Sequence, residues 1–379
     1  NNGGDGLVAA RHLKETGALV DVYLLSERQT DDIVYHEALT AGLTPIDVHM
    51  DVGFERLREA LAEADIVVDS IFGTGAVRPI TGAIAAVLAL ITQEKTRRSE
   101  LTIIAVDLPS GLNADTGEVD PATLQADMTI TLANPKRGLF LYPGADYTGN
   151  VSVADIGIPA GLDDDILTEL LTDGVVGELL PSRPADANKG TFGKVLAVAG
   201  PPEFCGAPAL TCQAAYRTGA GLVTLAARKS LHPVFAAKLT ETTHLLLPET
   251  SDGELSPEAV AIVTDRLKDF DAVAIGPGFG KDPVTYLFFH GVMAALPPEV
   301  KVVLDADALN ILAATNDWWQ TLERPFVLTP HIREMSRLTG LTVEQIQADR
   351  IGVARRYAEL WQMVVVLKGA HTVIASPDG

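Results

Sequence analysis

The stretch of sequence that decides the fold is LTIIAVDLPSGLNADTG, residues 101–117. Its first half, residues 102–106, is apolar and rich in β-branched side chains, which is the pattern of a buried β-strand. Asp107 follows where that strand should end, and the Pro-Ser-Gly at residues 109–111 then predicts a turn. Open parallel sheets bind ligands at the carboxyl ends of their strands. A carboxylate, a hydroxyl group and closely packed backbone amides therefore meet where a ligand would bind.

Strand and helix patterns alternate along the chain. In the first part, strand patterns occupy residues 19–25, 66–68, 102–106, 128–132 and 151–156, and helical patterns occupy residues 7–14, 31–41, 55–63 and 82–92. In the second part, strand patterns occupy residues 195–199, 221–226, 272–275, 301–304, 326–328 and 364–367, with a small-residue helix at 207–218. Such alternation predicts right-handed βαβ units around parallel sheets, so both parts are expected to be α/β domains.

A polar connection separates the two parts. An acidic helix is predicted at residues 162–171, and residues 181–188, rich in Pro and Ala, have the composition of a linker. We therefore predict two domains, residues 1–160 and residues 161–379.

Both ends of the chain are expected to lie inside a longer protein. The chain has no initiator Met, and Asn1 begins in a loop pattern. Residues 376–379 form a turn pattern that should lead into another strand.

The composition narrows the classes of partner. The 379 residues carry a formal net charge of −21, and no basic patch stands out, so we expect no nucleic-acid partner. No apolar run reaches transmembrane length and no signal peptide is visible, so we expect no membrane association. Cys205 and Cys212 have no metal-site spacing, which favours a reducing, cytoplasmic compartment. We also expect the protein to form a homo-oligomer.

Two further loops in the first part combine polar side chains with glycine. Residues 1–6, NNGGDG, precede a predicted helix, and residues 69–75, DSIFGTG, follow a predicted strand. Glycines let backbone amides approach an anion, and the start of a helix adds positive dipole character. The spacing is not G-x-G-x-x-G, so the standard dinucleotide fingerprint is a poor match. Arg78, followed by Pro79, either contacts a substrate phosphate or is a solvated surface residue.

Asn2, Asp69 and Ser110 supply oxygen donors from the three loops. Ligand sets made only of oxygen suit hard cations such as potassium, sodium or magnesium. The alternative is that these side chains hydrogen-bond the backbone of their own loops, and residue chemistry alone leaves both interpretations open.

The motifs NNGGDG, D-x-x-FGTG-x-x-RP and VD-x-PSGLNADTG, in this order, resemble the pattern of the NAD(P)H-hydrate epimerases. The resemblance covers about residues 1–160 and implies a Rossmann-like domain that interconverts the R and S hydrates of NADH and NADPH. It implies that Asn2, Asp69 and Ser110 bind K⁺. It also implies a substrate site that contains Asn1, Asn2, Gly3, Gly4, Asp5, Gly73, Thr74, Gly75, Ala76, Val77, Arg78, Pro79 and Asp107. The family's strand before Asn1 is absent from this sequence.

The resemblance also gives Asp107 the role of acid–base residue. Epimerisation at the carbon that bears the hydroxyl group needs a group that can move a proton on a reduced nicotinamide. A carboxylate at a strand end, beside a cation and backbone amides, is suited to that role.

Strand ends in the second part carry four polar motifs. Residues 276–280, GPGFG, let backbone pack against a ligand, and residues 368–372, KGAHT, provide a Lys and a tight turn suited to a nucleotide phosphate. In DADALN, Asp305 and Asp307 either hold a metal ion or act structurally, with Asp307 as the cap of the next helix and Asp305 as a loop anchor. His331, in TPH, is either a plain loop residue or part of the site.

Together with KGTFGKVLAVAG and RTGAGLVT, these motifs resemble the ADP/ATP-dependent NAD(P)H-hydrate dehydratases, which have a ribokinase-like fold. The likeness runs from about residue 189 to the end of the chain. It implies contacts to the hydrate from Ala207, Gly280 and His331, and contacts to ADP or ATP, bound with Mg²⁺, from Lys368, Gly369, Ala370, His371 and Thr372.

The sequence departs from the dehydratase pattern in two places. Ile332-Arg333-Glu334 stands where the family has Pro-Gly-Glu. The family's N-x-G…GTGD segment, which carries the catalytic Asp and the anion hole, would lie after Gly379. We therefore expect residues 1–379 alone to bind nucleotide weakly and not to dehydrate the hydrate.

The leading hypothesis is a bifunctional enzyme of nicotinamide-nucleotide repair. Its first domain epimerises the hydrates NADHX and NADPHX, and its second dehydrates the S form with ADP or ATP. The alternative enzyme is a ribokinase-like kinase of a vitamin or sugar, which gives no role to residues 1–117. A non-enzymatic scaffold is a third hypothesis, but it needs no intact Asp107 or Ser110. An assay on NADH hydrate, with and without ADP or ATP, discriminates the three.

Overall fold

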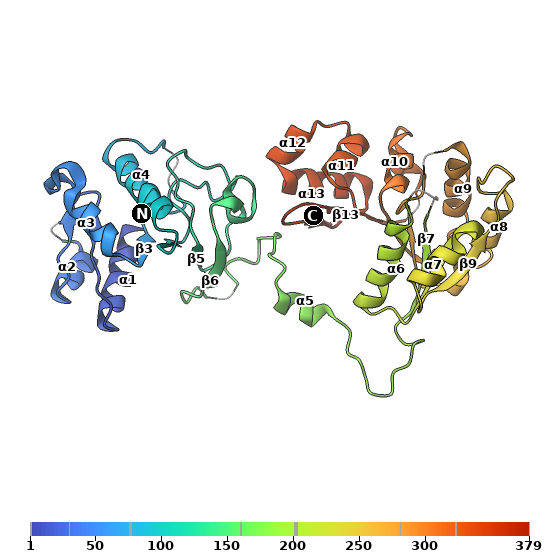
Figure 1. Ribbon diagram of the computed structural model, residues 1–379, viewed down its shortest axis with the longest axis horizontal. Helices are drawn as coiled ribbons and strands as arrows, with labels where there is room; N and C mark the ends of the chain where they lie inside the picture. Colours follow the sequence, from blue (N-terminus) through green and yellow to red (C-terminus); the bar gives the residue numbers. More distant parts are fainter. Residues whose placement is uncertain are drawn as a thin grey trace. The chain divides into compact units, whose positions relative to one another are not determined.

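The computed structural model describes residues 2–29, 31–75, 78–159, 161–200, 204–280, 282–322 and 324–378. The chain divides into two compact units, Asn1–Leu170 and Leu171–Gly379, and each is described by itself (Figure 1). The predicted domain boundary after residue 160 stays a prediction. Within the residues just given, no helix combines the length and apolar character that a membrane crossing requires.

A parallel four-stranded sheet in the order β3-β4-β5-β6 organises the first unit. Its strands are β3 (Ile66–Asp69), β4 (Thr102–Val106), β5 (Met128–Leu132) and β6 (Asn150–Ala154). Two short strands, β1 (Tyr23–Leu24) and β2 (Ile46–Asp47), pair parallel in a separate sheet. The helices are α1 (Gly3–Glu15), α2 (Ile33–Thr40), α3 (Glu55–Glu63), α4 (Gly82–Arg97) and the short 3₁₀ turns η1 (Val48–Met50), η2 (Val52–Phe54), η3 (Arg137–Phe140) and η4 (Gly144–Asp146).

The core of the first unit fixes the direction of β4. Ile103 and Ala105 are buried in one cluster with Leu57 of α3 and Leu88 of α4, whereas the residues between them are only half-buried. Successive side chains of a strand point to opposite faces, so this alternation anchors one face of β4 on the helices. The carboxyl end of β4, with Asp107, is thereby held at a fixed place beside the ends of β3 and β5.

An eight-stranded sheet in the order β14-β13-β12-β11-β10-β7-β8-β9 organises the second unit. Its strands are β7 (Lys194–Val198), β8 (Leu222–Arg228), β9 (Thr243–Leu247), β10 (Ala272–Ile275), β11 (Lys301–Leu304), β12 (Val327–Leu328), β13 (Val364–Leu367) and β14 (Val373–Ala375). Every pairing is parallel except that of β13 with β14. The fold class predicted from the sequence, two α/β units on parallel sheets, is confirmed.

Helices cover both faces of this sheet. They are α5 (Asp173–Leu179), α6 (Gly206–Thr218), α7 (His232–Lys238), α8 (Glu258–Thr264), α9 (Pro283–Ala294), α10 (Asp307–Ala313), α11 (Ile332–Thr339), α12 (Val343–Ala348), α13 (Arg350–Trp361) and the 3₁₀ turns η6 (Lys229–Leu231), η7 (Leu267–Asp269) and η8 (Trp318–Thr321). Ala197 of β7 packs with Phe235 of α7, while Leu196 and Val198 on either side of it join a second cluster that contains residues of α8 to α13. A parallel sheet buried on both faces explains the continuous apolar runs in its strands.

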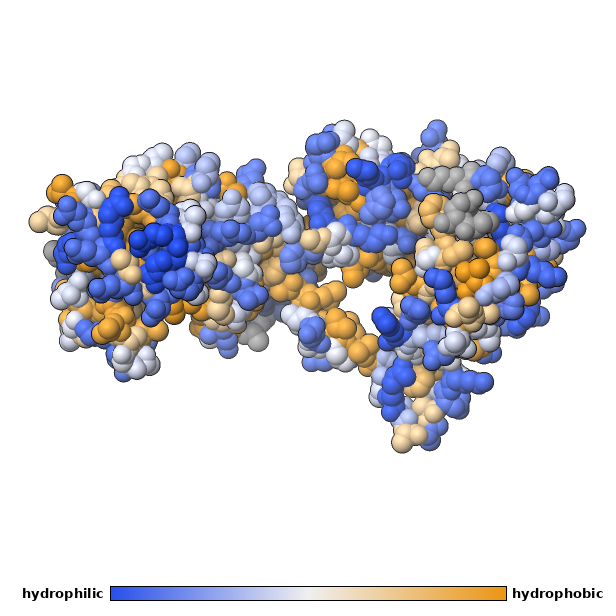
Figure 2. All heavy atoms as spheres, in the orientation of Figure 1, coloured by the Kyte–Doolittle hydropathy of each residue, from blue (hydrophilic) through white to orange (hydrophobic). Residues whose placement is uncertain are grey.

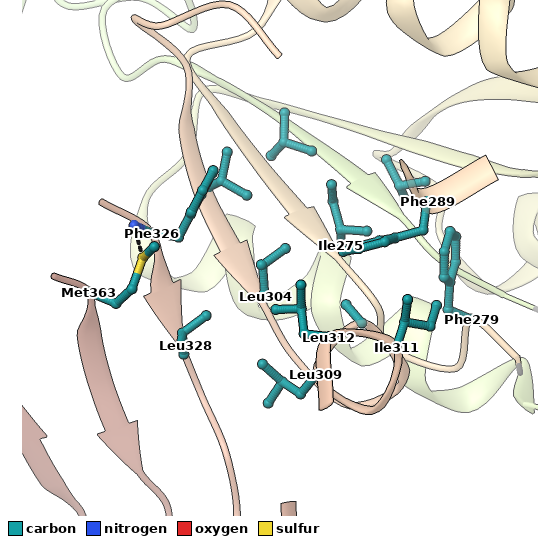
Figure 3. Packing of buried hydrophobic residues seen from close by; sticks show 14 of the residues in the cluster. Ile275, Phe279, Phe289, Leu304, Leu309, Ile311, Leu312, Phe326, Leu328 and Met363 are labelled. Carbon is teal, nitrogen blue, oxygen red and sulfur yellow. Dashed lines mark hydrogen bonds between the residues drawn. The ribbon is translucent and has the colours of Figure 1, made fainter. Parts of the chain in front are cut away.

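The larger cluster also fixes the loop after β11. Ile275, Leu304 and Leu328 from three neighbouring strands pack with Leu309 and Leu312 of α10 (Figure 3). Because α10 starts three residues after β11 ends, this packing determines where the intervening acidic residues lie.

Three predicted elements differ from the structure. Helix α1 starts at Gly3, so the glycines of NNGGDG form its first turn rather than a loop before it. The strand predicted at residues 19–25 is reduced to the two residues of β1. The helix predicted at residues 162–171 is wrong, and the helix of this region is α5 instead.

The wrong helix has a physical explanation in burial. Ile166 and Leu167 are 61% and 65% exposed, so no apolar face would stabilise a helix there. Isolated helices of this length are marginal in water. Helix α5 is itself exposed, and apolar residues gather where it lies on the surface in Figure 2.

Candidate active site

Asp107 occupies the carboxyl end of β4 in an unusual backbone conformation. Its φ is 69°, in the left-handed region that Asp tolerates better than most residues. Its carboxylate Oδ1 accepts hydrogen bonds from the Leu132 amide at 3.1 Å, from the Thr131 hydroxyl at 3.3 Å and from the Lys136 ammonium at 2.5 Å. Among the described residues, no donor contacts Oδ2. One oxygen is therefore held by the protein, and the other can meet a ligand.

Lys136 is a residue of this site that the sequence analysis missed. It follows β5 and lies at the same carboxyl edge of the sheet as Asp107. The available signal was a Lys four residues after a predicted strand. That signal is weak, because most lysines at such positions are solvated.

Asp69 and Ser110, two of the three predicted cation ligands, are in direct contact. The Ser110 hydroxyl donates to Asp69 Oδ1 at 2.6 Å, and the Ser110 amide donates to Oδ2 at 2.8 Å. Ser110 Oγ in turn accepts from the Phe72 amide at 2.9 Å. Both side chains are buried. The ends of β3 and β4 are thus joined by polar side chains, and the K⁺ site predicted there stays a prediction.

Asn2, the third predicted ligand, is buried on the same loops. Its side-chain amide donates to the Val106 carbonyl at 2.6 Å, one residue before Asp107. A Cβ at Gly73 would overlap the Asn2 amide group, so the close approach of these loops requires glycine there. Asn2 precedes α1 but makes no side-chain cap to it.

Asp69 lacks a cationic partner among the described residues. Burial raises its pKa, and hydrogen bonds from Ser110 and the Ile71 amide oppose this only in part. Buried carboxylates are normally paired or bound to a cation. The described residues contain no cluster of three or more His, Cys, Asp or Glu side chains that could hold a metal ion. Any cation here would therefore rely on a mixed set of carboxylate, hydroxyl and amide oxygens.

The predicted substrate loops surround this edge of the first unit. Gly3, Gly4 and Asp5 lie in the first turn of α1, and Gly73, Thr74 and Gly75 follow β3. Arg78 and Pro79 are exposed before α4, while Asn1, Ala76 and Val77 lie outside the described residues. A Cβ at Gly3 would overlap the guanidinium of Arg28, which pairs with Asp32 at 3.2 Å and which the sequence analysis had not singled out.

In the second unit, three neighbouring strands bring charged groups together. The Lys368 ammonium, after β13, donates to Asp305 Oδ1, after β11, at 2.6 Å. The Thr329 hydroxyl, after β12, donates to the same oxygen at 2.9 Å. Glu334 Oε2 lies 3.9 Å from the Lys368 ammonium. Asp305 thus anchors Lys368 and Thr329 rather than only its own loop.

Asp307 does not cap the next helix, so that interpretation is wrong. The residue before α10 is Ala306, which makes no side-chain cap. Asp307 Oδ2 accepts from the amides of Phe279 and Gly280 at 3.2 and 3.0 Å. The carboxylate therefore holds the glycine loop that follows β10.

His331 combines a structural role with an exposed ring. Its Nδ1 accepts from the amides of Arg333 and Glu334 at 3.1 and 3.2 Å, and Glu334 accepts from the His331 amide, which together form a capping box at the start of α11. Since Nδ1 is an acceptor, the neutral ring carries its hydrogen on Nε2. Nearly half of the side chain, 47%, is exposed.

Ala207 and the glycine loop are neighbours. Ala207 is in the first turn of α6, and a Cβ at Gly278 would contact it at an ordinary 3.6 Å. Ala207 therefore lies beside the glycine loop that contains Gly280, while His331 makes its hydrogen bonds to Arg333 and Glu334.

The predicted nucleotide residues 368–372 form the turn between β13 and β14. Arg350, which the sequence analysis missed, donates to the Ala370 carbonyl at 2.9 Å and to the Leu367 carbonyl at 3.2 Å. The Thr372 hydroxyl donates to the Gly369 carbonyl at 3.1 Å, and His371 is left-handed with φ of 53°. The Arg350 guanidinium thus joins the turn to the last residue of β13.

Comparison with known proteins agrees with both halves of this description. The family model described as NAD(P)H-hydrate dehydratase matches residues 195–379, and the model described as YjeF-related protein N-terminus matches residues 1–138. The bifunctional NAD(P)H-hydrate repair enzyme Nnr of Moorella thermoacetica is 43% identical over all of this chain and 71% of the relative. That of Thermofilum pendens is 38% identical over all of this chain and 71% of the relative.

A solved structure is also similar to this chain. The ADP/ATP-dependent NAD(P)H-hydrate dehydratase from Bacillus subtilis, co-crystallised with ATP/Mg²⁺, is 33% identical with a TM-score of 0.44, over 55% of this chain and 69% of that one. The two relatives match both parts of this chain, which confirms the resemblance to the bifunctional enzymes and favours it over a ribokinase-like kinase. The chain belongs to the family of bifunctional NAD(P)H-hydrate repair enzymes.

Proposed function

We propose that the first unit interconverts the R and S hydrates of NADH and NADPH, and that the second returns the S hydrate to NADH or NADPH at the expense of ADP or ATP. The observation that carries the first assignment is the carboxylate of Asp107, held through Oδ1 with Oδ2 available to a ligand. Inversion of the carbon that bears the hydroxyl group requires one of its bonds to break and re-form, and a positioned carboxylate can take and return the proton that this exchange moves. Asp107 is therefore the acid–base residue of the proposal.

The substrate of the first unit lies along the loops at the carboxyl edge of its sheet. In this proposal, backbone amides of the first turn of α1 and of residues 73–75 bind its phosphates, because glycines allow close approach and a helix start favours anions. This explains how a chain of net charge −21 binds an anionic nucleotide without a basic surface.

K⁺ fits the oxygen cluster of the first unit. Asp69, Ser110 and Asn2 would hold it, and the ion would neutralise the buried Asp69 carboxylate beside the substrate loops. The substitution Asp69→Asn, which removes the only charged oxygen ligand of this proposed site, tests whether K⁺ binds there.

Thermal unfolding is expected to report this cation directly. Wild type should gain of the order of 5 °C in melting temperature when K⁺ replaces tetramethylammonium, whereas Asp69→Asn should gain nothing. The K⁺ response of each protein is compared with its own K⁺-free melting temperature, because Asp69→Asn removes the buried charge and also one of the two acceptor oxygens that Ser110 and Ile71 use. Asp51→Asn is the control: this buried carboxylate accepts from the Arg56 and Leu57 amides and should respond to K⁺ as wild type does. An equal rise in melting temperature with K⁺ in wild type and Asp69→Asn would show that K⁺ does not bind at Asp69.

In the second unit, Ala207, Gly280 and His331 contact the hydrate, and residues 368–372 contact the nucleotide. The Lys368 ammonium suits a phosphate, and Asp307 and Arg350 hold the two loops that must face the ligands. ADP or ATP, bound with Mg²⁺, supplies the phosphoryl group that makes the hydroxyl a leaving group. His331 Nε2 lies 3.4 Å from Glu334 Oε1 on a half-exposed ring, and in this proposal its N–H is shared between that carboxylate and the substrate.

The deciding experiment uses the separated R and S hydrates of NADH with the full-length protein. Nicotinamide absorbance should return from the S hydrate only with ADP or ATP. Without nucleotide, the R hydrate should equilibrate with the S hydrate. Absence of R-to-S conversion above the buffer rate would contradict the assignment of the first unit, and absorbance recovery without nucleotide would contradict that of the second.

The proposal places the protein in the cytoplasm as a homo-oligomer. Both Cys205 and Cys212 are thiols, which suits a reducing compartment. Light scattering on the purified protein tests the assembly.

A further inference from the structure

We propose that Lys136 is the residue that positions Asp107 for epimerisation. This inference rests on the proposed function of the first unit and adds a second residue to its mechanism. The Lys136 ammonium lies 2.5 Å from Asp107 Oδ1, 2.6 Å from the Leu132 carbonyl and 3.1 Å from the Thr131 hydroxyl. Its side chain is only 19% exposed.

The geometry separates a positioning role from direct contact with substrate. A lysine ammonium has three N–H donors, and the three acceptors use all of them. No donor is left for a ligand, so Lys136 acts through Asp107. With Oδ1 fixed, rotation of the carboxylate is blocked and Oδ2 keeps one orientation.

Backbone hydrogen bonds on both sides of Lys136 fix the segment that carries it beside Asp107. Ala133, directly after β5, has φ of 63°, in the left-handed region that non-glycine residues rarely adopt. Its amide is held by the Ala154 carbonyl at 2.9 Å. On the other side of Lys136, Gly138 donates to the Ala114 carbonyl at 2.7 Å and packs so closely on Asn113 that a Cβ would overlap it. Both ends of the segment are thus pinned, one to β6 and one to the loop after Asp107.

Two residues with left-handed φ, Asp107 and Ala133, therefore follow neighbouring strands at the carboxyl edge of the sheet. Asp107 ends β4 and Ala133 follows β5, the neighbouring strand. Strained conformations persist where the surrounding structure determines them, and they gather at functional sites.

The first unit contains a matched control for this pair. Lys95 donates to Asp127 at 2.9 Å and to the Leu101 carbonyl at 2.6 Å, and Asp127 accepts from the Ile103 amide at 2.7 Å. This pair has the same chemistry but lies at the amino ends of β4 and β5. Losing it removes an ion pair whose side chains are 26% and 42% exposed, at the edge of the sheet away from the substrate.

The test compares Lys136→Met and Lys95→Met in R-to-S conversion by the full-length protein. For Lys136→Met we expect kcat to fall about 100-fold, because small misplacements of a catalytic group have effects of that size, while KM stays within threefold. Lys95→Met should keep the wild-type kcat. Added ethylamine should restore part of the rate to Lys136→Ala, which a purely structural role would not allow.

Further outcomes decide the matter if Lys136→Met folds poorly. Lys136→Arg keeps the charge, but the planar guanidinium cannot replace three tetrahedral donors. Its kcat should therefore lie between that of Lys136→Met and that of wild type. A kcat within threefold of wild type in Lys136→Met, or an equal loss in Lys95→Met, would overturn the inference while leaving the epimerase assignment intact. Failure of wild type itself to convert the R hydrate overturns that assignment and the inference with it.

Discussion

Asp107→Asn, made in the full-length protein, is expected to lower R-to-S conversion by about 100- to 10,000-fold, the range that general acid–base catalysis contributes. Asn fills the same volume and tolerates the left-handed φ of 69° at this position, so the fold should be kept. What is lost is the carboxylate oxygen that takes and returns the proton. Dehydration of the pure S hydrate should not change, because the second unit has its own site.

Asp127→Asn is the control for this substitution. Asp127 is also a carboxylate paired with a lysine in the first unit, but at the amino edge of the sheet. It should lose stability and keep the epimerisation rate. Conversion of the R hydrate by Asp107→Asn at the wild-type rate, measured by chromatographic separation of the two hydrates, would exclude Asp107 as the acid–base residue.

The sequence predicted the first site where local pattern and chemistry agree. The apolar runs of β4 and β5 were placed with their observed bounds, and Asp107, Asp69 and Ser110 were expected at strand ends where the structure has them. Each of these follows from a strand signal next to a turn signal. Helix α1 begins earlier than predicted. Glycine has a poor helix propensity, so the sequence pattern placed Gly3 and Gly4 in a loop, whereas they lie in the first turn of the helix.

Partners far apart in the chain could not be predicted. Lys136 meets Asp107 across 29 positions of sequence, and Arg350 meets Ala370 across 20. Such contacts depend on strand order and loop conformation. The roles of Asp305 and Asp307 stayed open for a related reason: Ala306, with φ of 50°, turns the chain so that the two carboxylates serve different partners.

The second large effect is expected at Lys368. Lys368→Met should lower the dehydration rate of the full-length protein about 100-fold, comparable with the loss of one donor to a developing charge. The substitution removes the cation that we propose for the nucleotide phosphates and leaves Asp305 and Glu334 without their shared ammonium. Affinity for ATP, measured by titration calorimetry, should fall as well, because two carboxylates then face the phosphates.

Lys301→Met separates this effect from a general loss of charge. Lys301 is exposed at the first position of β11, the strand whose carboxyl end leads to Asp305, so its removal changes the net charge equally at the opposite edge of the sheet. It should leave ATP affinity and dehydration unchanged. Adding Asp305→Asn to Lys368→Met should recover part of the ATP affinity, since it removes one of the repelling carboxylates. Unchanged ATP affinity in Lys368→Met would show that the nucleotide phosphates lie elsewhere, and a further loss in the double variant would show that Asp305 contacts the nucleotide through more than Lys368.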